Sequence, residues 1–116
     1  MDIPIGSAVS DTEINIARDF SRYPSGRVVL DGPNSGERFR DQFLIPALNS
    51  SERIVIVLDG VRGYPSSFTE EAFGGLVRAG FDKEDLLRRI RISFASEAYC
   101  GYKDDILDAI KQASPP

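Results

Sequence analysis

Two adjacent hydroxyl side chains, Ser66 and Ser67, lie at the expected start of a helix that follows an apolar strand. A helix start carries free backbone N–H groups and the positive end of the helix dipole, which both favour a phosphate. Phosphorylation would add a charge of about −1.5 to −2 and change the surface that a partner meets. Ser66 and Ser67 are therefore candidate phospho-acceptors.

Two other interpretations of these serines remain open. Ser67 and Glu70 have the spacing of a capping box, in which the hydroxyl and the carboxylate each accept a bond from a free amide. Glu70 and Glu71 would also repel a phosphate, so capping alone ranks first and the phosphorylation switch second. A direct contact to an anionic ligand ranks third.

The strand before the serines is predicted at residues 54–58, five consecutive apolar residues of which four are β-branched. A short run that is apolar on both faces indicates a strand buried on both sides. After the serines, apolar residues recur at helical spacing, at Phe68, Ala72, Phe73, Leu76 and Val77. Gly80 is the expected end of this helix.

The other elements follow from local patterns. Further strands are expected at 13–17, 27–30 and 90–94, and further helices at 36–48, 82–89 and 102–113. The short connection between the first two strands favours an antiparallel pair, and Pro46 predicts a kink or an early end of its helix.

The resulting order, β-β-α-β-α-(α)-β-α, predicts an α/β fold with a mixed sheet of four to five strands. That sheet would have a parallel centre, with the strand at 54–58 as its central strand, and an antiparallel edge. Residues 1–11 are expected to form a flexible leader and residues 12–113 a single domain.

Composition narrows the function. The net charge of −4 argues against non-specific binding of nucleic acid. The lack of histidine removes the Ser-His-Asp and Cys-His arrangements and the usual zinc sites. No glycine-rich nucleotide motif is present, so we expect no metal, no cofactor and no enzymatic activity.

Location is predicted from the same sequence. No apolar run approaches the roughly 20 residues that a membrane helix needs, and the N-terminus lacks the pattern of a signal peptide. The single cysteine, Cys100, fits a reducing compartment. A cytoplasmic protein without membrane contact is the expectation.

In open α/β sheets the functional crevice lies beyond the carboxyl ends of the strands. The loops that reach this edge supply the candidate residues for binding a partner or ligand: Asn34, Ser35, Arg38, Asp59, Arg62, Tyr64, Ser66, Ser67 and Thr69. Arg62 with Tyr64 could form an exposed interaction hot spot, or ordinary loop surface. Gly74 and Gly75 indicate close packing of their helix on the sheet, or else a docking notch.

Three segments resemble a known family. They are SGERFR at 35–40, LIPAL at 44–48 and SSFTEEAFGGL at 66–76. The chain is similar over roughly residues 12 to 112 to the bacterial STAS-like domains of unknown function, which are related in fold to the STAS domain of anti-sigma-factor antagonists.

In the antagonists, a serine at this strand–helix junction is phosphorylated by a kinase that is also the anti-sigma factor. The resemblance implies that Ser66 is the phospho-acceptor, followed by Ser67. This chain departs from the antagonists at Pro65, where they have Asp, and at residues 68–71, where they are rich in glycine.

The favoured hypothesis is a non-enzymatic regulatory module that binds a protein partner. By resemblance, that partner would be a kinase-type ATPase or an anti-sigma-like regulator. The alternative is a domain that senses a small ligand or nucleotide, with Arg62 or Arg38 holding an anion. A weak hydrolase-type enzyme using Asp31, Asp59 and Tyr64 ranks last.

Overall fold

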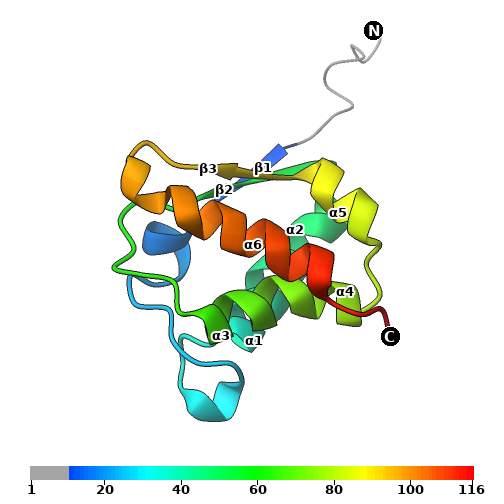
Figure 1. The fold of residues 1–116 in the computed structure, drawn as a ribbon, viewed down its shortest axis with the longest axis horizontal. Helices are drawn as coiled ribbons and strands as arrows, with labels where there is room; N and C mark the ends of the chain where they lie inside the picture. The colour runs from blue at the N-terminus through cyan, green and yellow to red at the C-terminus, as the bar shows by residue number, and fades with distance from the viewer. Residues whose placement is uncertain (1–10) are drawn as a thin grey trace, which may run out of the picture.

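Three parallel strands form the sheet of this protein, whose computed structural model describes residues 11–116 (Figure 1). They are β1 (Asp11–Asn15), β2 (Arg53–Val57) and β3 (Ile90–Ser93), in the order β1-β2-β3. The central place of β2 is as predicted. The expected leader lies outside the described residues except for Asp11, which begins β1.

Six α-helices accompany the sheet in the described residues. They are α1 (Gly36–Phe39), α2 (Ile45–Ser50), α3 (Ser66–Thr69), α4 (Gly75–Arg78), α5 (Lys83–Arg89) and α6 (Cys100–Gln112). The wider π-helical turns Arg40–Leu44 and Glu70–Gly74 join α1 to α2 and α3 to α4. The chain therefore has a first helical segment, residues 36–50, and a second helical segment, residues 66–78. A further π-helical turn, Ile16–Phe20, follows β1.

The first helical segment continues through Pro46, where a kink or an early end was expected. Proline cannot supply a backbone N–H and crowds the preceding turn. Here the π-helical turn lies directly before Pro46, and the Ile45 N–H reaches back five residues to the Arg40 carbonyl. The wider turn accommodates the proline, and the helix runs on to Ser50.

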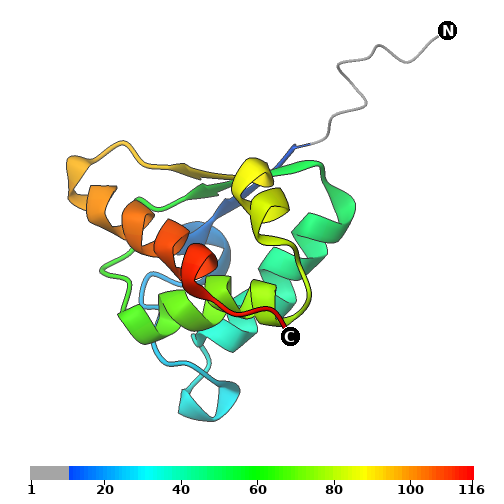
Figure 2. The same cartoon turned by 45° about the vertical axis from the view of Figure 1, so that its right-hand side comes forward.

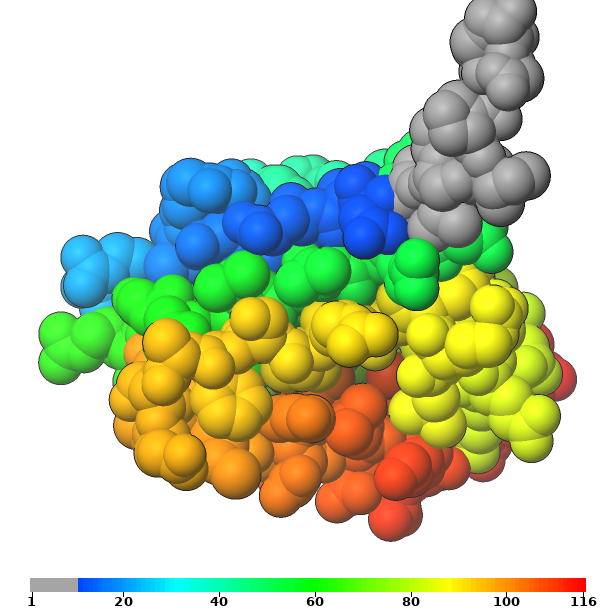
Figure 3. Space-filling view, turned by 90° about the horizontal axis from the view of Figure 1, so that it is seen from above, coloured from blue at the N-terminus to red at the C-terminus, as the bar shows by residue number. Residues whose placement is uncertain are grey.

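All of the helices lie on one side of the sheet (Figures 1 and 2). Ile14, Ile56 and Ile92 stand in register on this covered face and are buried. On the other face the three strands lie side by side, and no helix of the described chain covers them (Figure 3). Val55 and Val57 are only half-buried there. The prediction that β2 is buried on both sides is therefore wrong for this face.

The strand predicted at 27–30 is wrong, and with it the antiparallel edge. The Asp31 carboxylate accepts the backbone N–H groups of Arg27 and Val28 at 2.9 and 3.0 Å. Such local side-chain bonds compete with a sheet ladder. Val29–Asp31 forms a 3₁₀ turn instead, and the described sheet has three strands rather than four or five.

The core between the helices is built from phenylalanines. Phe39 from the first helical segment packs on Phe68 and Phe73 from the second, with ring centroids 5.8 and 6.3 Å apart. A Cβ on Gly74 would lie 3.2 Å from the Ala109 carbonyl of α6, and one on Gly75 would collide with the Arg40 guanidinium. The predicted close packing of the glycine pair is confirmed, but its partners are helices rather than the sheet.

Candidate functional site

Ser66 is the first residue of α3 and is exposed, while Ser67 is half-buried. The predicted capping box is wrong because the helix begins two residues earlier than that box requires, with Pro65 rather than Ser67 as its N-cap and no side-chain cap. The Glu70 carboxylate instead binds Arg27 and Arg78. Neither serine hydroxyl makes a hydrogen bond within residues 11–116, so both are available for other chemistry.

Ser66 borders a hollow of about 280 Å³ between α3 and α6, which we call the acidic hollow. Its lining residues are Ser66, Thr69, Glu70, Asp105, Asp108, Ala109 and Gln112. Three of them carry carboxylates and none is basic. The helix start attracts an anion, but the surrounding carboxylates oppose one. This arrangement does not favour direct capture of an anionic ligand at Ser66.

Asp59 and Tyr64 hold the loop that precedes the serines. The Asp59 carboxylate accepts the N–H groups of Ala95 and Ser96 at 2.9 and 3.1 Å, which ties the end of β2 to the end of β3. The buried Tyr64 hydroxyl donates to the Leu58 carbonyl at 2.8 Å, and burial raises the pKa of Tyr64. Both candidates stabilise the loop through these hydrogen bonds.

Arg62 is exposed, but Tyr64 is not, so the predicted Arg62–Tyr64 surface pair is wrong. The Arg62 N–H donates to the Arg22 carbonyl at 2.9 Å, which places the two segments side by side. A groove of about 440 Å³ lies between them, here called the rim groove. It is lined by Tyr23, Pro24, Ser25, Arg62, Gly63, Tyr64, Pro65 and Tyr102. The exposed tyrosine beside Arg62 is therefore Tyr23, from a distant part of the sequence.

The candidates at the start of α1 are structural. Ser35 is buried and is the N-cap, since its Oγ accepts the Arg38 N–H at 3.2 Å. Asn34 donates to the Tyr23 carbonyl at 3.3 Å. The Arg38 guanidinium donates to the Pro33 carbonyl at 2.8 Å and lies 5.2 Å from the Phe20 ring centre.

Thr69 is buried as well. Of the nine predicted contact residues, the structure leaves Arg62 and Ser66 as the exposed ones. They lie at the two ends of the short segment 62–66, which borders the rim groove on one side and the acidic hollow on the other.

Val28, Val29 and Leu30 form an exposed apolar tip that the sequence did not predict as a surface feature. These side chains are 38, 56 and 97% exposed. The tip projects from the body of the protein beyond the start of α1 (Figure 1, light blue to cyan). The signal for it was the same apolar run that predicted a strand, because an apolar run without a neighbouring strand has nothing to cover it.

The apolar tip is held by hydrogen bonds. Besides the two bonds to Asp31, the Val29 N–H donates to the Glu37 carboxylate at 2.8 Å. The Glu37 N–H in turn donates to the Arg27 carbonyl at 2.9 Å. Arg27 also binds Glu70 and Glu71 at the second helical segment. The tip is thus fixed to the same end of the molecule as Ser66.

Two other kinds of feature, a cluster of potential metal ligands and a membrane-spanning helix, are absent from the described residues. Residues 11–116 contain no group of three or more His, Cys, Asp or Glu side chains placed to hold a metal ion. Within the same range, none of the helices combines the length and the apolar character needed to cross a membrane.

Comparison with known proteins identifies a family. A family model described as a STAS-like domain of unknown function (DUF4325) matches residues 35–99, more than half of the chain. Comparison with curated proteins and with solved structures finds no significant match. The matched range includes Ser66 and all of the predicted contact residues except Asn34.

Proposed function

This chain belongs to the family of STAS-like domains of unknown function, and from that premise we propose that it is a non-enzymatic regulatory module that binds a protein partner. The contact surface is the end of the molecule that carries the apolar tip, Tyr23, Arg62 and Ser66. We define this set of residues as the contact rim.

The exposure of the apolar tip is the observation that carries the proposal. Three consecutive apolar side chains face water on a backbone fixed by Asp31 and Glu37. Contiguous exposed apolar surface is typical of sites that bind other proteins. A loop already held in one conformation loses little entropy on binding. Tyrosine and arginine, the neighbouring residue types, are enriched at interaction hot spots.

Ser66 is the candidate switch of this surface. A phosphate there would add about −1.5 to −2 charges beside the three carboxylates of the acidic hollow. Because no basic side chain lines that hollow, the modification would act by repulsion, releasing a partner whose surface is acidic or spreading α3 from α6. A kinase-type ATPase or an anti-sigma-like regulator is the proposed partner class.

The test uses the full chain and a kinase-type ATPase of the proposed partner class from the same organism. We expect the wild-type chain to bind this ATPase and Leu30→Asp to weaken binding by at least about tenfold, since loss of a buried anchor residue costs about 2 kcal/mol or more. Ala79→Asp adds the same carboxylate at the exposed far end of the second helical segment and is the matched control. Equal binding by both variants would contradict the proposal.

The switch is tested separately by mass spectrometry after incubation with the ATPase and ATP. The expected result is a gain of one phosphate that Ser66→Ala abolishes and Ser67→Ala preserves. Ser66→Glu should weaken binding of the partner. Binding of the ATPase without any phosphate gain would remove the switch and retain the interaction module.

The rim groove favours a second candidate function, the sensing of a small ligand. Its volume of about 440 Å³ is within the range of small-molecule sites, and Tyr23, Tyr64 and Tyr102 supply aromatic walls beside Arg62. A thermal-shift screen against nucleotides tests this, because a ligand of the native state raises Tm. A shift that Arg62→Ala abolishes would support the sensor; no shift with any nucleotide would reject a nucleotide ligand.

A further inference from the structure

The outer side of β3 carries unused backbone hydrogen-bonding groups. In the described sheet, β3 has β2 on one side and no strand on the other. The Leu58 N–H donates to the Ser93 carbonyl at 3.0 Å, so Ser93 faces β2. Backbone groups of successive residues alternate in direction along a strand. The N–H and C=O of Ile92 are therefore directed away from β2.

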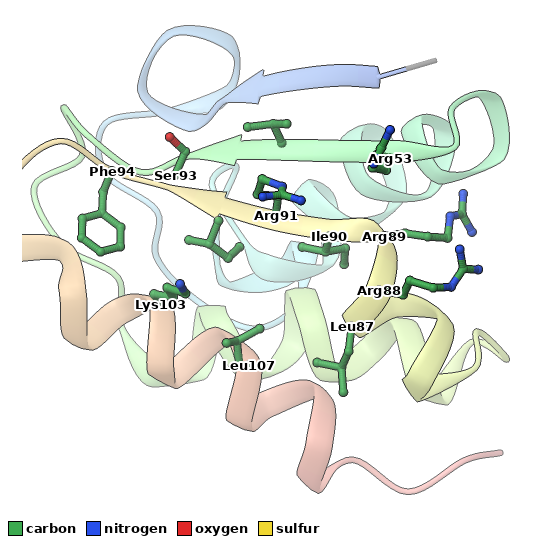
Figure 4. A pocket seen from close by; sticks show the side chains of 12 residues that line it. Arg53, Leu87, Arg88, Arg89, Ile90, Arg91, Ser93, Phe94, Lys103 and Leu107 are labelled. Carbon is green, nitrogen blue, oxygen red and sulfur yellow. The ribbon is translucent and has the colours of Figure 1, made fainter. Parts of the chain in front are cut away.

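A groove of about 620 Å³ runs along this edge, here called the basic groove (Figure 4). Its apolar side is formed by Leu87 of α5, Leu107 of α6, Ile92 and Phe94. Leu87, Phe94 and Leu107 are only half-buried. An element placed against β3 would cover them, and apolar burial stabilises such a complex.

Five cationic side chains line the same groove, and none of its lining residues is acidic: Arg53, Arg88, Arg89, Arg91 and Lys103. In the described chain, Arg91 and Lys103 form no ion pair. Arg88 and Arg89 share the single carboxylate of Asp85. This concentration of positive charge stands out in a protein whose net charge is −4.

We propose that the basic groove binds an extended acidic peptide segment of a partner protein, which adds to β3 as a further strand. Strand addition uses the free backbone groups for affinity and the alternating side chains for specificity. Side chains of an added strand alternate between the two faces of the sheet in step with β3. Those level with Ile92 enter the apolar side of the groove, and those level with Arg91 lie on the open face.

The preferred peptide therefore alternates apolar and acidic residues. Arg91 contacts the acidic side chains on the open face. Lys103 lies at one end of the groove and Arg88 at the other, where each can meet a further carboxylate (Figure 4).

Two other occupants fit the groove less well. A second copy of the chain, joined through the same strand, would bring its own Arg88 and Arg91 against those of the first and would be repelled. A nucleic acid would meet the positive charges, but it would leave the apolar side chains and the free backbone groups of Ile92 without partners.

The experiment measures binding of a fluorescein-labelled peptide of about seven alternating Glu and Val residues, long enough to span a short strand. We expect saturable binding to the complete chain and much weaker binding of the matching Lys-Val peptide. Arg91→Glu and Lys103→Glu should each weaken binding by roughly three- to tenfold, the range for reversing an exposed charge pair. Arg18→Glu, which changes an exposed arginine that follows β1 and lies outside the groove, is the matched control.

Strand addition is separated from simple charge attraction by two readouts. N-methylation of alternate peptide nitrogens keeps the charges but removes the backbone donors that face β3, and it should abolish binding. Saturating peptide should also slow amide hydrogen exchange at Ile92.

Four results would overturn the proposal. The first is absence of binding at a peptide concentration of about 1 mM, which corresponds to a binding free energy weaker than about 4 kcal/mol. The second is equal binding of the N-methylated and unmodified peptides. The third is competition by a single-stranded oligonucleotide at equal concentration, and the fourth is a stable dimer of the chain that Arg91→Glu disrupts.

Discussion

Arg40 donates to both the carboxylate and the backbone carbonyl of Glu71, at 2.8 and 3.1 Å, and so joins the two helical segments. The two side chains are only 14 and 16% exposed. Glu71 also pairs with Arg27. Arg40 also pairs with Asp41, so this contact is part of a larger ion-pair network. The guanidinium reaches Glu71 across Gly75, whose missing side chain leaves the space for it.

Gly75→Ala tests whether the Arg40–Glu71 contact depends on the space above Gly75. The added methyl group collides with the Arg40 guanidinium, so we expect a loss of about 1–3 kcal/mol in the free energy of unfolding from overpacking. Gly101→Ala is the control, since nothing lies within 4 Å of its Cβ position in α6. It should stabilise the protein by about 0.5–1 kcal/mol through helix propensity. Equal changes in the free energy of unfolding of Gly75→Ala and Gly101→Ala, measured in urea, would contradict this explanation.

Ser35→Ala and Ser66→Ala distinguish a serine whose side chain caps a helix from one whose side chain makes no hydrogen bond in the described chain. Ser35 caps α1 with its buried hydroxyl, and its removal should cost about 0.5–2 kcal/mol. Ser66 makes no side-chain cap, so Ser66→Ala should change stability by less than about 0.5 kcal/mol. Thermal unfolding of both variants measures the difference. A large loss of stability for Ser66→Ala would show that Ser66 does cap the helix.

Tyr64→Phe removes the hydrogen bond to the Leu58 carbonyl and leaves that buried acceptor unpaired. We expect a loss of about 1–3 kcal/mol at pH 7. The exposed Tyr23→Phe is the control and should be nearly neutral.

Alkaline pH gives Tyr64 a second signature. Burial raises its folded-state pKa above the ordinary value of 10.0. The stabilisation by the neutral hydroxyl is therefore fully present below pH 10 and is lost as the pH rises above it, because the unfolded chain ionises first. Wild type should lose stability above pH 10 more steeply than Tyr64→Phe. Parallel pH profiles of the two proteins would contradict this.

Glu70→Gln should show the opposite pH dependence. The hydrogen bond from Arg78, supported by the one from Arg27, lowers the pKa of Glu70 below 4.5. Its stabilisation is present above that value and is lost as the pH falls through the lower folded-state pKa. Because the side chain is 38% exposed, solvent screening limits the effect at pH 7 to about 0.5–1 kcal/mol.

The Glu70 prediction is checked by denaturant unfolding from pH 7 to pH 3. The difference between wild type and Glu70→Gln should shrink as the pH falls below 4.5. A double-mutant cycle with Arg78→Met isolates the coupling between the two side chains. A difference that stays constant over this range would show that Glu70 acts through something other than its charge.

The structure agrees with only part of the site that the sequence predicted. The place of Ser66 at a helix start follows from the switch between strand and helix spacing, which is local information. Whether its hydroxyl caps the helix depends on where the first helical turn begins, and that turn begins at Ser66 itself. The burial of Tyr64 depends on Tyr99 and Tyr102, which approach from the start of α6.

The amino-acid sequence by itself determined the α/β class, the central strand, the amphipathic helices, the start of a helix at residue 36 and the family resemblance, which the match to residues 35–99 confirms. These features depend on the order of neighbouring residues. The tertiary structure alone decided that residues 27–30 form an exposed tip, that one face of the sheet stays open, and that the basic side chains of β3, α5 and α6 share one groove. These depend on which surfaces meet when distant segments pack, and a local pattern does not specify its partner in space.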